Sequence, residues 1–164
     1  MPVINLTQLR AVLPAGARLL GLDPGGQRIG VALSDVEWRL AGPYATLRRG
    51  KLAANAAEIL AIARREGAGG LLIGLPLRAD GTVGPAAQAA RDWAHALSAA
   101  TLLPAALWDE RLSTATVTRM LIEEADLSRR RRAEVVDRAA AAHILQSALD
   151  QQSALDQSAL DASR

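Results

Sequence analysis

Apolar runs on either side of a tight turn dominate the first third of the 164-residue chain. Residues 18–22 and 29–33 are two such runs, and they flank a Pro-Gly-Gly sequence at 24–26 that is a strong hairpin signal. A third strand, interrupted by polar residues, is predicted over 41–48. Three strands joined by short connections predict an antiparallel meander.

Strands and helices then alternate. Apolar residues recur at helical spacing from Leu52, and Gly67 is expected to end that helix. Buried strands are predicted over 69–76 and 105–110, and between them Pro85 suits the first position of a helix. Strands that alternate with helices are joined by crossovers and lie parallel. The sequence therefore predicts an α/β fold in which a meander is extended into a mixed sheet.

The last third of the chain predicts helices separated by a charged loop. Ser113 is a suitable N-cap for a helix, and residues 125–134 are expected to form the charged loop. The last helix is predicted to start near Val135. Residues 151–164 repeat Ser-Ala-Leu-Asp-Gln at steps of five or six residues, which fits no heptad, so a frayed low-complexity tail is expected.

Composition narrows the class of protein. Half of the residues are hydrophobic, which predicts a globular chain, with one domain over residues 18–150 after a lead-in at 1–17. Aromatic residues total 2%, which argues against stacking of bases on aromatic side chains. The absence of cysteine excludes disulfides and Cys-ligated zinc. No signal peptide or membrane-length apolar run is seen, so a cytoplasmic location without membrane contact is expected.

Positive charge is clustered rather than large. The formal net charge is +2 and the isoelectric point is about 9.9, which favours nucleic acid only slightly. Lys51 is the only lysine, and the other basic residues are arginines, whose planar fork suits phosphate. Arg48 and Arg49 lie beside it, and residues 129–132 are four consecutive arginines.

Three carboxylates stand out by position. Asp23 follows the first apolar run and Glu110 ends the last predicted strand, and the ends of neighbouring central strands lie close together. Asp137 shares one helix face with Ala140 and Ile144, so it is predicted to point at the sheet from the first turn of its helix. Each has an ordinary explanation as well: a turn aspartate, a surface ion pair, or a helix-dipole contact. A carboxylate facing the core is costly unless it is paired or binds a metal.

A site made of three carboxylates suits hard cations such as Mg²⁺ or Mn²⁺. Two such ions can activate water and stabilise the leaving oxygen of a phosphodiester. In that interpretation Asp23, Glu110 and Asp137 are both the catalytic residues and the metal ligands, and Asp23 bridges the two ions.

Four stretches of the chain resemble the YqgF/RuvX family of ribonuclease H-like proteins. They are LGLDPGGQRIGVALSD, LLIGLPLRADGTVGPAAQAARDWA, WDERLSTATV and VDRAAAAHILQ, in that order within residues 18–149. The resemblance implies a five-stranded mixed sheet flanked by helices and a divalent-metal nuclease site at Asp23, Glu110 and Asp137. It also implies hydrolysis of phosphodiester bonds in 5′-end maturation of the 16S ribosomal RNA precursor, with the ribosome or its precursor as partner.

The same resemblance implies substrate-binding residues around the acids. Thr82 lies in a glycine-containing loop whose amides would contact phosphate, Arg28 lies in the hairpin turn, and Arg111 follows Glu110. The run of arginines would attract the substrate at the rim, although such a run is usually a solvated loop. The substrate-binding candidates are Arg28, Thr82, Arg111, Arg129, Arg130, Arg131 and Arg132.

Other functions remain open at this stage. A Holliday junction resolvase or related DNA-repair nuclease would act on branched DNA as a two-fold dimer, and no strong dimer signal is present, so a monomer or weak homodimer acting on RNA is favoured. The Asp-x-Gly loop also resembles that of the actin-like ATPases, but the chain has length for only one of their two lobes. A non-catalytic RNA-binding assembly factor is the third class, and buried acids facing phosphate argue against it.

Overall fold

The computed structural model describes residues 3–112 and 128–164. The strands are β1 (Val3–Ile4), β2 (Arg18–Pro24), β3 (Arg28–Ser34), β4 (Ala41–Arg48), β5 (Ala68–Leu75) and β6 (Ala105–Asp109). The helices are α1 (Leu6–Val12), α2 (Leu52–Glu66), α3 (Pro85–Thr101), the short 3₁₀ helix η1 (Glu110–Leu112) and α5 (Arg129–Ala162). The strands form one sheet in the order β1-β6-β5-β2-β3-β4.

The predicted meander is confirmed as β2, β3 and β4, each antiparallel to the next. The predicted parallel strands are confirmed too, because β5 lies parallel to β2 and β6 lies parallel to β5. Gly67 ends α2 in the left-handed conformation with φ of 72°, where glycine has no Cβ to clash. Pro85 occupies the first turn of α3.

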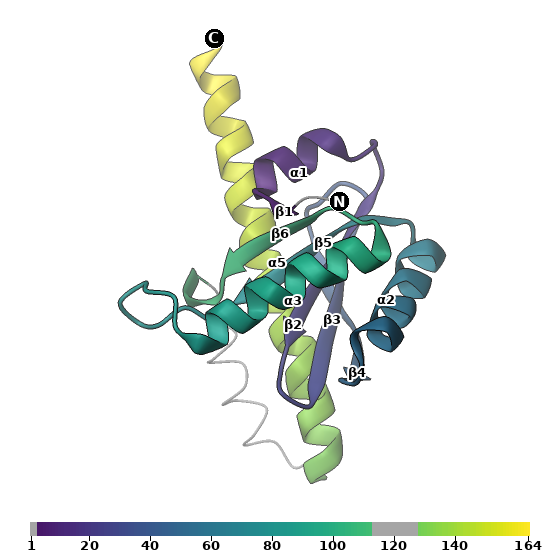
Figure 1. Cartoon of the computed structure of the whole chain (residues 1–164). Helices are drawn as coiled ribbons and strands as arrows, with labels where there is room; N and C mark the ends of the chain where they lie inside the picture. Colours follow the sequence, from purple (N-terminus) through teal and green to yellow (C-terminus); the bar gives the residue numbers. More distant parts are fainter. Residues whose placement is uncertain (1–2, 113–127) are drawn as a thin grey trace.

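Helices cover both faces of the sheet (Figure 1). The face covered by α2 and α3 buries large aliphatic side chains, among them Leu22, Ile59 and Ile73. The face covered by α5 buries a core rich in alanine, including Ala140, Ala141 and Ala148. The result is a three-layer α/β arrangement, as the sequence predicts.

The sheet has six strands, and the expectation of five is therefore corrected. The additional strand is β1, two residues long, which pairs in parallel with β6. It lies in the segment predicted to be a weakly patterned lead-in. That segment is ordered by a capping box, in which the Asn5 side chain accepts from the Gln8 amide and the Gln8 side chain accepts from the Asn5 amide. Leu9 of α1 is fully buried, so α1 is part of the core.

Helix α5 begins at Arg129, six residues before the predicted start near Val135. The Ser128 side chain accepts from the Arg131 amide and caps the helix, and arginine is a good helix former. Most of the expected charged loop within the described range is therefore helical. Asp137 consequently lies in the third turn of α5 rather than the first.

The repetitive tail is helical as far as Ala162, where a frayed end was expected. Its glutamines and aspartates stand four residues apart and form side-chain hydrogen bonds along the helix, which stabilise successive turns. These are Gln146 to Asp150 at 2.9 Å, Gln152 to Asp156 at 3.0 Å and Gln157 to Asp161 at 3.1 Å. The Thr7 hydroxyl also donates to Gln152, so α1 holds the inner part of this segment.

The helix predicted after Ser113, with Val117, Met120 and Leu121 on its inner face, lies outside the described residues. In the two described ranges, none of the helices combines the length and the apolar character that crossing a membrane requires.

Candidate active site

Asp23 lies near the end of β2 and is 8% exposed. Side chains alternate across a strand, so Asp23 shares a face with Gly21. A Cβ on Gly21 would stand 2.9 Å from Leu145 Cβ of α5. Asp23 therefore faces α5, as the alternation of the strand requires.

Glu110 is the first residue of η1, directly after β6 ends at Asp109, which corrects the expectation that Glu110 is the last residue of the strand. Its Oε1 lies 2.8 Å from where a Cβ on Gly74 would stand. Gly74 follows Ile73, and Ile73 pairs with Leu22, the residue before Asp23. The Glu110 side chain thus lies over the strand next to Asp23, on the face covered by α5.

Asp137 approaches from the helix. A Cβ on Gly30 would overlap the Asp137 carbonyl group, so the backbone of α5 lies directly on β3 at this point. Gly30 is the cross-strand partner of Asp23. The Asp137 carboxylate is one-fifth exposed, and its Oδ2 accepts from Arg28 Nε at 2.5 Å. The expectation that Asp137 points at the sheet is confirmed.

The fold therefore brings all three predicted acids to one end of one face. Asp23 lies between two glycines, Gly30 on its own hairpin and Gly74 on the neighbouring strand, and Asp137 and Glu110 lie over these glycines. Within the described residues, no three His, Cys, Asp or Glu side chains are grouped closely enough to hold a metal ion. In this conformation the charge of Asp137 is balanced by Arg28 instead.

The donor chemistry of the three acids fits a hard divalent cation, because all of the side-chain donors are carboxylate oxygens. For Asp137 to act as a ligand, it would exchange Arg28 for the ion.

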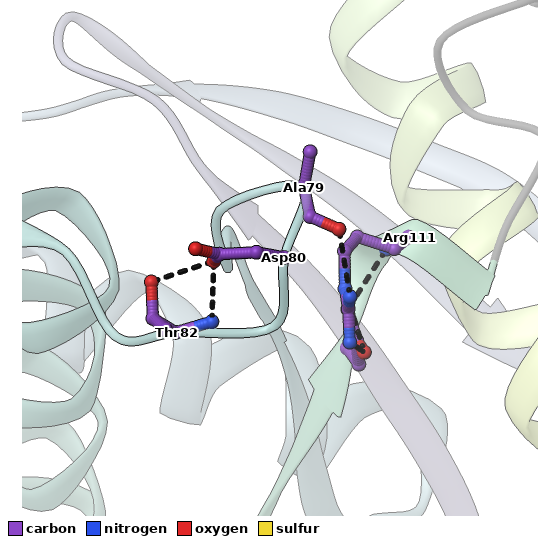
Figure 2. A network of polar contacts seen from close by, with 5 residues as sticks. Ala79, Asp80, Thr82 and Arg111 are labelled. Carbon is purple, nitrogen blue, oxygen red and sulfur yellow. Dashed lines mark hydrogen bonds and ion pairs between the residues drawn. The ribbon is translucent and has the colours of Figure 1, made fainter.

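Arg111 binds the neighbouring loop rather than open solvent (Figure 2). Its guanidinium donates to Asp109 at 2.7 Å and to the Ala79 carbonyl at 3.2 Å. The hydrogen bond from Arg111 holds the pKa of Asp109 below the ordinary value for an aspartate. The pairing of Asp109 with Leu75, which packs against Ala87 and Ala90 of α3, places Asp109 on the face opposite Glu110. Arg111 therefore fixes the loop after β5 to the end of β6.

Thr82 is also bound within its own loop. Its hydroxyl donates to Asp80 Oδ1 at 2.7 Å, and its amide donates to the same oxygen at 2.9 Å. Both hydrogen bonds lower the pKa of Asp80. In this conformation the Thr82 side chain shapes the turn at Gly81, whose φ is 88°.

The four consecutive arginines form the first turn of α5. Arg130 is 93% exposed at the side chain and lies 3.5 Å from Glu134, one turn along the helix. The cluster therefore projects from a rigid helix end and not from the loop that its composition predicts.

Two kinds of residue were missed by reasoning from the sequence. The first is the set of glycines inside strands, Gly21, Gly30 and Gly74, on which α5 and Glu110 lie. A glycine within an apolar strand signals close approach of another backbone, so this signal was available. The second is Asp109, which forms an ion pair with Arg111. Their nearness in the sequence does not by itself reveal this contact.

Known proteins share both the sequence and the fold. A family model described as RuvX, Holliday junction resolvase, matches residues 17–151. A protein of Gluconacetobacter diazotrophicus is 61% identical over 150 residues, covering 92% of this chain and 97% of its own. One of Acidiphilium cryptum is 62% identical over 150 residues, covering 92% and 94%. Both carry the provisional name pre-16S rRNA nuclease.

Two solved structures of resolvases resemble the fold. RuvC of T. thermophilus in complex with a Holliday junction substrate has a TM-score of 0.50 at 14% identity, covering 83% of this chain and 95% of its own. The yeast mitochondrial Holliday junction resolvase Ydc2 has a TM-score of 0.52 at 12% identity, covering 91% and 84%. These similarities show the ribonuclease H-like fold. The family match over residues 17–151 and the two relatives more than 60% identical show that the chain belongs to the RuvX family.

Proposed function

We propose that this protein is a divalent-metal-dependent nuclease that hydrolyses phosphodiester bonds in 5′-end maturation of the 16S ribosomal RNA precursor. The observation that carries the proposal is that Asp23, Glu110 and Asp137 lie at the same end of the face under α5. The names of the two relatives, each more than 60% identical, support the RNA substrate. Such a substrate assigns the protein to the cytoplasm, with the ribosome precursor as its partner.

Asp23, Glu110 and Asp137 would hold the metal, either Mg²⁺ or Mn²⁺ and two ions in the proposed active form. Bound there, the ions supply charge neutralisation and Lewis-acid activation at the scissile phosphate. Asp23 would suit the role of a ligand common to both ions, because its strand is held on both sides. Asp23 pairs with Gly30 on one side, and β5 flanks its strand on the other. Three carboxylates without a cation would repel a phosphodiester, so the metal is expected to strengthen substrate binding at the acids.

The surrounding residues take different roles in this proposal. Arg28 neutralises Asp137 in this structure, and its guanidinium would be available to the substrate if Asp137 held the ion. Arg111 and Thr82 fix the loop beside the site and present its backbone amides. Arg129, Arg130, Arg131 and Arg132 attract the phosphate backbone from the end of α5.

A Holliday junction resolvase is the second candidate, and the description of the matching family favours it. Symmetrical cutting of a junction needs two active sites related by a two-fold axis. A monomer or weak homodimer, as expected here, is better suited to RNA.

The test is a Mn²⁺-dependent cleavage assay on a 16S precursor RNA and on a four-way DNA junction. We expect cleavage of the RNA by the wild type and a loss of at least about 100-fold in Asp23→Asn, because a metal ligand matters at least as much as the residues that hydrogen-bond to metal ligands in known sites. Asp92→Asn is the matched control, since Asp92 is an exposed aspartate of α3 on the other face.

Thermal unfolding of both variants shows whether the fold is intact. Retained cleavage in folded Asp23→Asn would exclude the metal site. Preferred cleavage of the junction by a dimeric species would replace the RNA nuclease with the resolvase.

A further inference from the structure

A hollow of about 730 Å³ lies between the β2–β3 turn, strand β4 and the first turns of α5. Strand β4 is the edge of the sheet. Four arginines line this hollow, which we call the edge groove: Arg28, Arg48, Arg49 and Arg130. Among the lining residues that the structure describes, Glu134 is the only acid. Four arginines against one glutamate give these residues a formal charge of +3, although Arg28 is paired with Asp137 and Arg130 with Glu134.

Two of these arginines oppose each other in the sheet. Arg28 and Arg48 are cross-strand partners, so their side chains leave the same face at neighbouring positions. Like charges placed directly opposite each other destabilise a sheet. Arg28 is balanced by Asp137, but among residues 3–112 and 128–164 the Arg48 guanidinium has no ion-pair partner. An anion in the groove would relieve this repulsion.

The walls of the groove are held in place. The Arg49 guanidinium donates to the Gly25 carbonyl at 2.7 Å and lies 5.5 Å from the centre of the Trp93 ring. The Thr46 hydroxyl donates to the Glu134 carbonyl at 2.6 Å, which ties β4 to α5. A cleft with fixed walls binds a ligand without first having to order them.

Arg28 connects the groove to the acids. It lines the groove, and its Nε donates to Asp137. One side chain therefore belongs both to the groove and to the surroundings of the three acids. No aromatic side chain lines it, so stacking of bases is not offered, whereas arginine forks suit phosphate oxygens.

We propose that the edge groove binds the phosphodiester backbone of the substrate strand next to the scissile phosphate. This inference rests on the proposed nuclease function and adds the path of the strand. Recognition through phosphate is independent of base sequence, and each contact releases counterions from the nucleic acid.

The test measures binding without cleavage. Anisotropy of a labelled 16S precursor RNA, in EDTA and over a range of salt concentrations, compares the wild type with the double variant Arg48→Gln/Arg130→Gln. Neither residue touches the three acids, and both are exposed. We expect a Kd about tenfold weaker at low salt, and a salt dependence of log K reduced by about 1.4, or about 0.7 for each lost contact with a single strand.

Two further variants make the result specific. Arg39→Gln/Arg64→Gln removes the same charge from exposed sites outside the groove and should bind as the wild type does. Arg48→Lys/Arg130→Lys keeps the charge and should retain most of the salt dependence. Binding is also measured with a DNA strand of the same sequence and with a four-way DNA junction. These ligands show whether the groove binds the phosphodiester backbone of RNA or that of DNA.

The outcomes separate the groove from the nuclease. If the wild type cleaves RNA but the Arg48→Gln/Arg130→Gln variant binds RNA as tightly as the wild type, the proposed role of the edge groove is wrong and the nuclease function is retained. If RNA binding depends on the groove arginines but Mn²⁺ produces no cleavage, the proposed nuclease function is wrong and the edge groove is retained as a binding site. A wild type that binds none of the three nucleic acids overturns the groove.

Discussion

The two faces of the sheet are built from different residues and serve different purposes. Under α2 and α3 the strands present large aliphatic side chains, such as Leu22 and Ile73, which are fully buried. Under α5 the same strands present Gly21 and Gly30, against which the helix packs closely, and Gly74, over which the Glu110 side chain lies. Large aliphatic side chains separate the sheet from α2 and α3. Glycine has no side chain, so α5 can approach the other face of the sheet closely.

This difference explains why the acids lie on only one face. Close approach of α5 brings the Asp137 backbone onto Gly30, beside Asp23, and leaves room over Gly74 for Glu110. On the opposite face, Asp109 serves as the anchor for Arg111. Both faces bury a hydrophobic core, and we infer that the glycine face also supplies the chemistry.

The largest expected effect on stability comes from the aliphatic face. Ile59→Ala removes a fully buried side chain of α2 and should lower the free energy of unfolding by about 2–5 kcal/mol. Denaturant unfolding measures this loss. Cleavage per folded molecule, assayed well below the melting temperature, should stay at the wild-type value. A loss of cleavage in the folded fraction would show that the two faces are not independent.

A smaller loss of stability with a larger loss of function is expected from the glycine face. Gly30→Ala places a Cβ against the Asp137 carbonyl, so α5 must shift, at a cost of about 1–3 kcal/mol. Because the shift carries Asp137 away from Asp23, Mn²⁺-dependent cleavage should also fall. Gly42→Ala in β4 is the matched control, since a Cβ there meets nothing within 4 Å. Wild-type cleavage in Gly30→Ala would contradict the close approach.

The smallest effect is expected at the Arg111 anchor and depends on pH. The pKa of Asp109 is lowered in the folded protein by its hydrogen bond from Arg111. This pair therefore stabilises the fold above the ordinary aspartate pKa, and that contribution is lost as the pH falls through the lowered value. Arg111→Gln should melt at a lower temperature than the wild type near neutral pH. The melting temperatures should begin to converge as the pH falls below about 3.9 and should coincide only below the lowered pKa of Asp109. A difference that persists unchanged in acid would assign Arg111 another role.

Most of the fold follows from local signals in the sequence. The hairpin before Arg28, the end of α2 at Gly67 and the start of α3 at Pro85 each depend on a residue whose backbone preference decides the outcome. The errors lie where tertiary contacts decide instead. Strand β1 is two residues long and exists because it pairs with β6, which no local pattern reveals.

The side of the sheet on which the three acids lie could be predicted from the sequence. The contacts that surround them could be predicted less well. The helical spacing of Asp137 and Ile144 predicts that the acid faces the sheet, and the structure agrees. The pairing of Asp137 with Arg28 joins residues 109 positions apart, so spacing along the chain gives no sign of it. The edge groove likewise needs the register that sets Arg28 opposite Arg48.

Helix α5 carries both the edge groove and an acid on one rigid rod. Arg130 and Asp137 are seven residues apart, which is about 10 Å along the helix axis. A stacked strand rises about 3.4 Å per nucleotide, so this length corresponds to about three nucleotides. A strand gripped at Arg130 would then be cut at a set number of nucleotides from the grip, whatever its sequence. The length of α5 between Arg130 and Asp137 would then set the position of the new 5′ end.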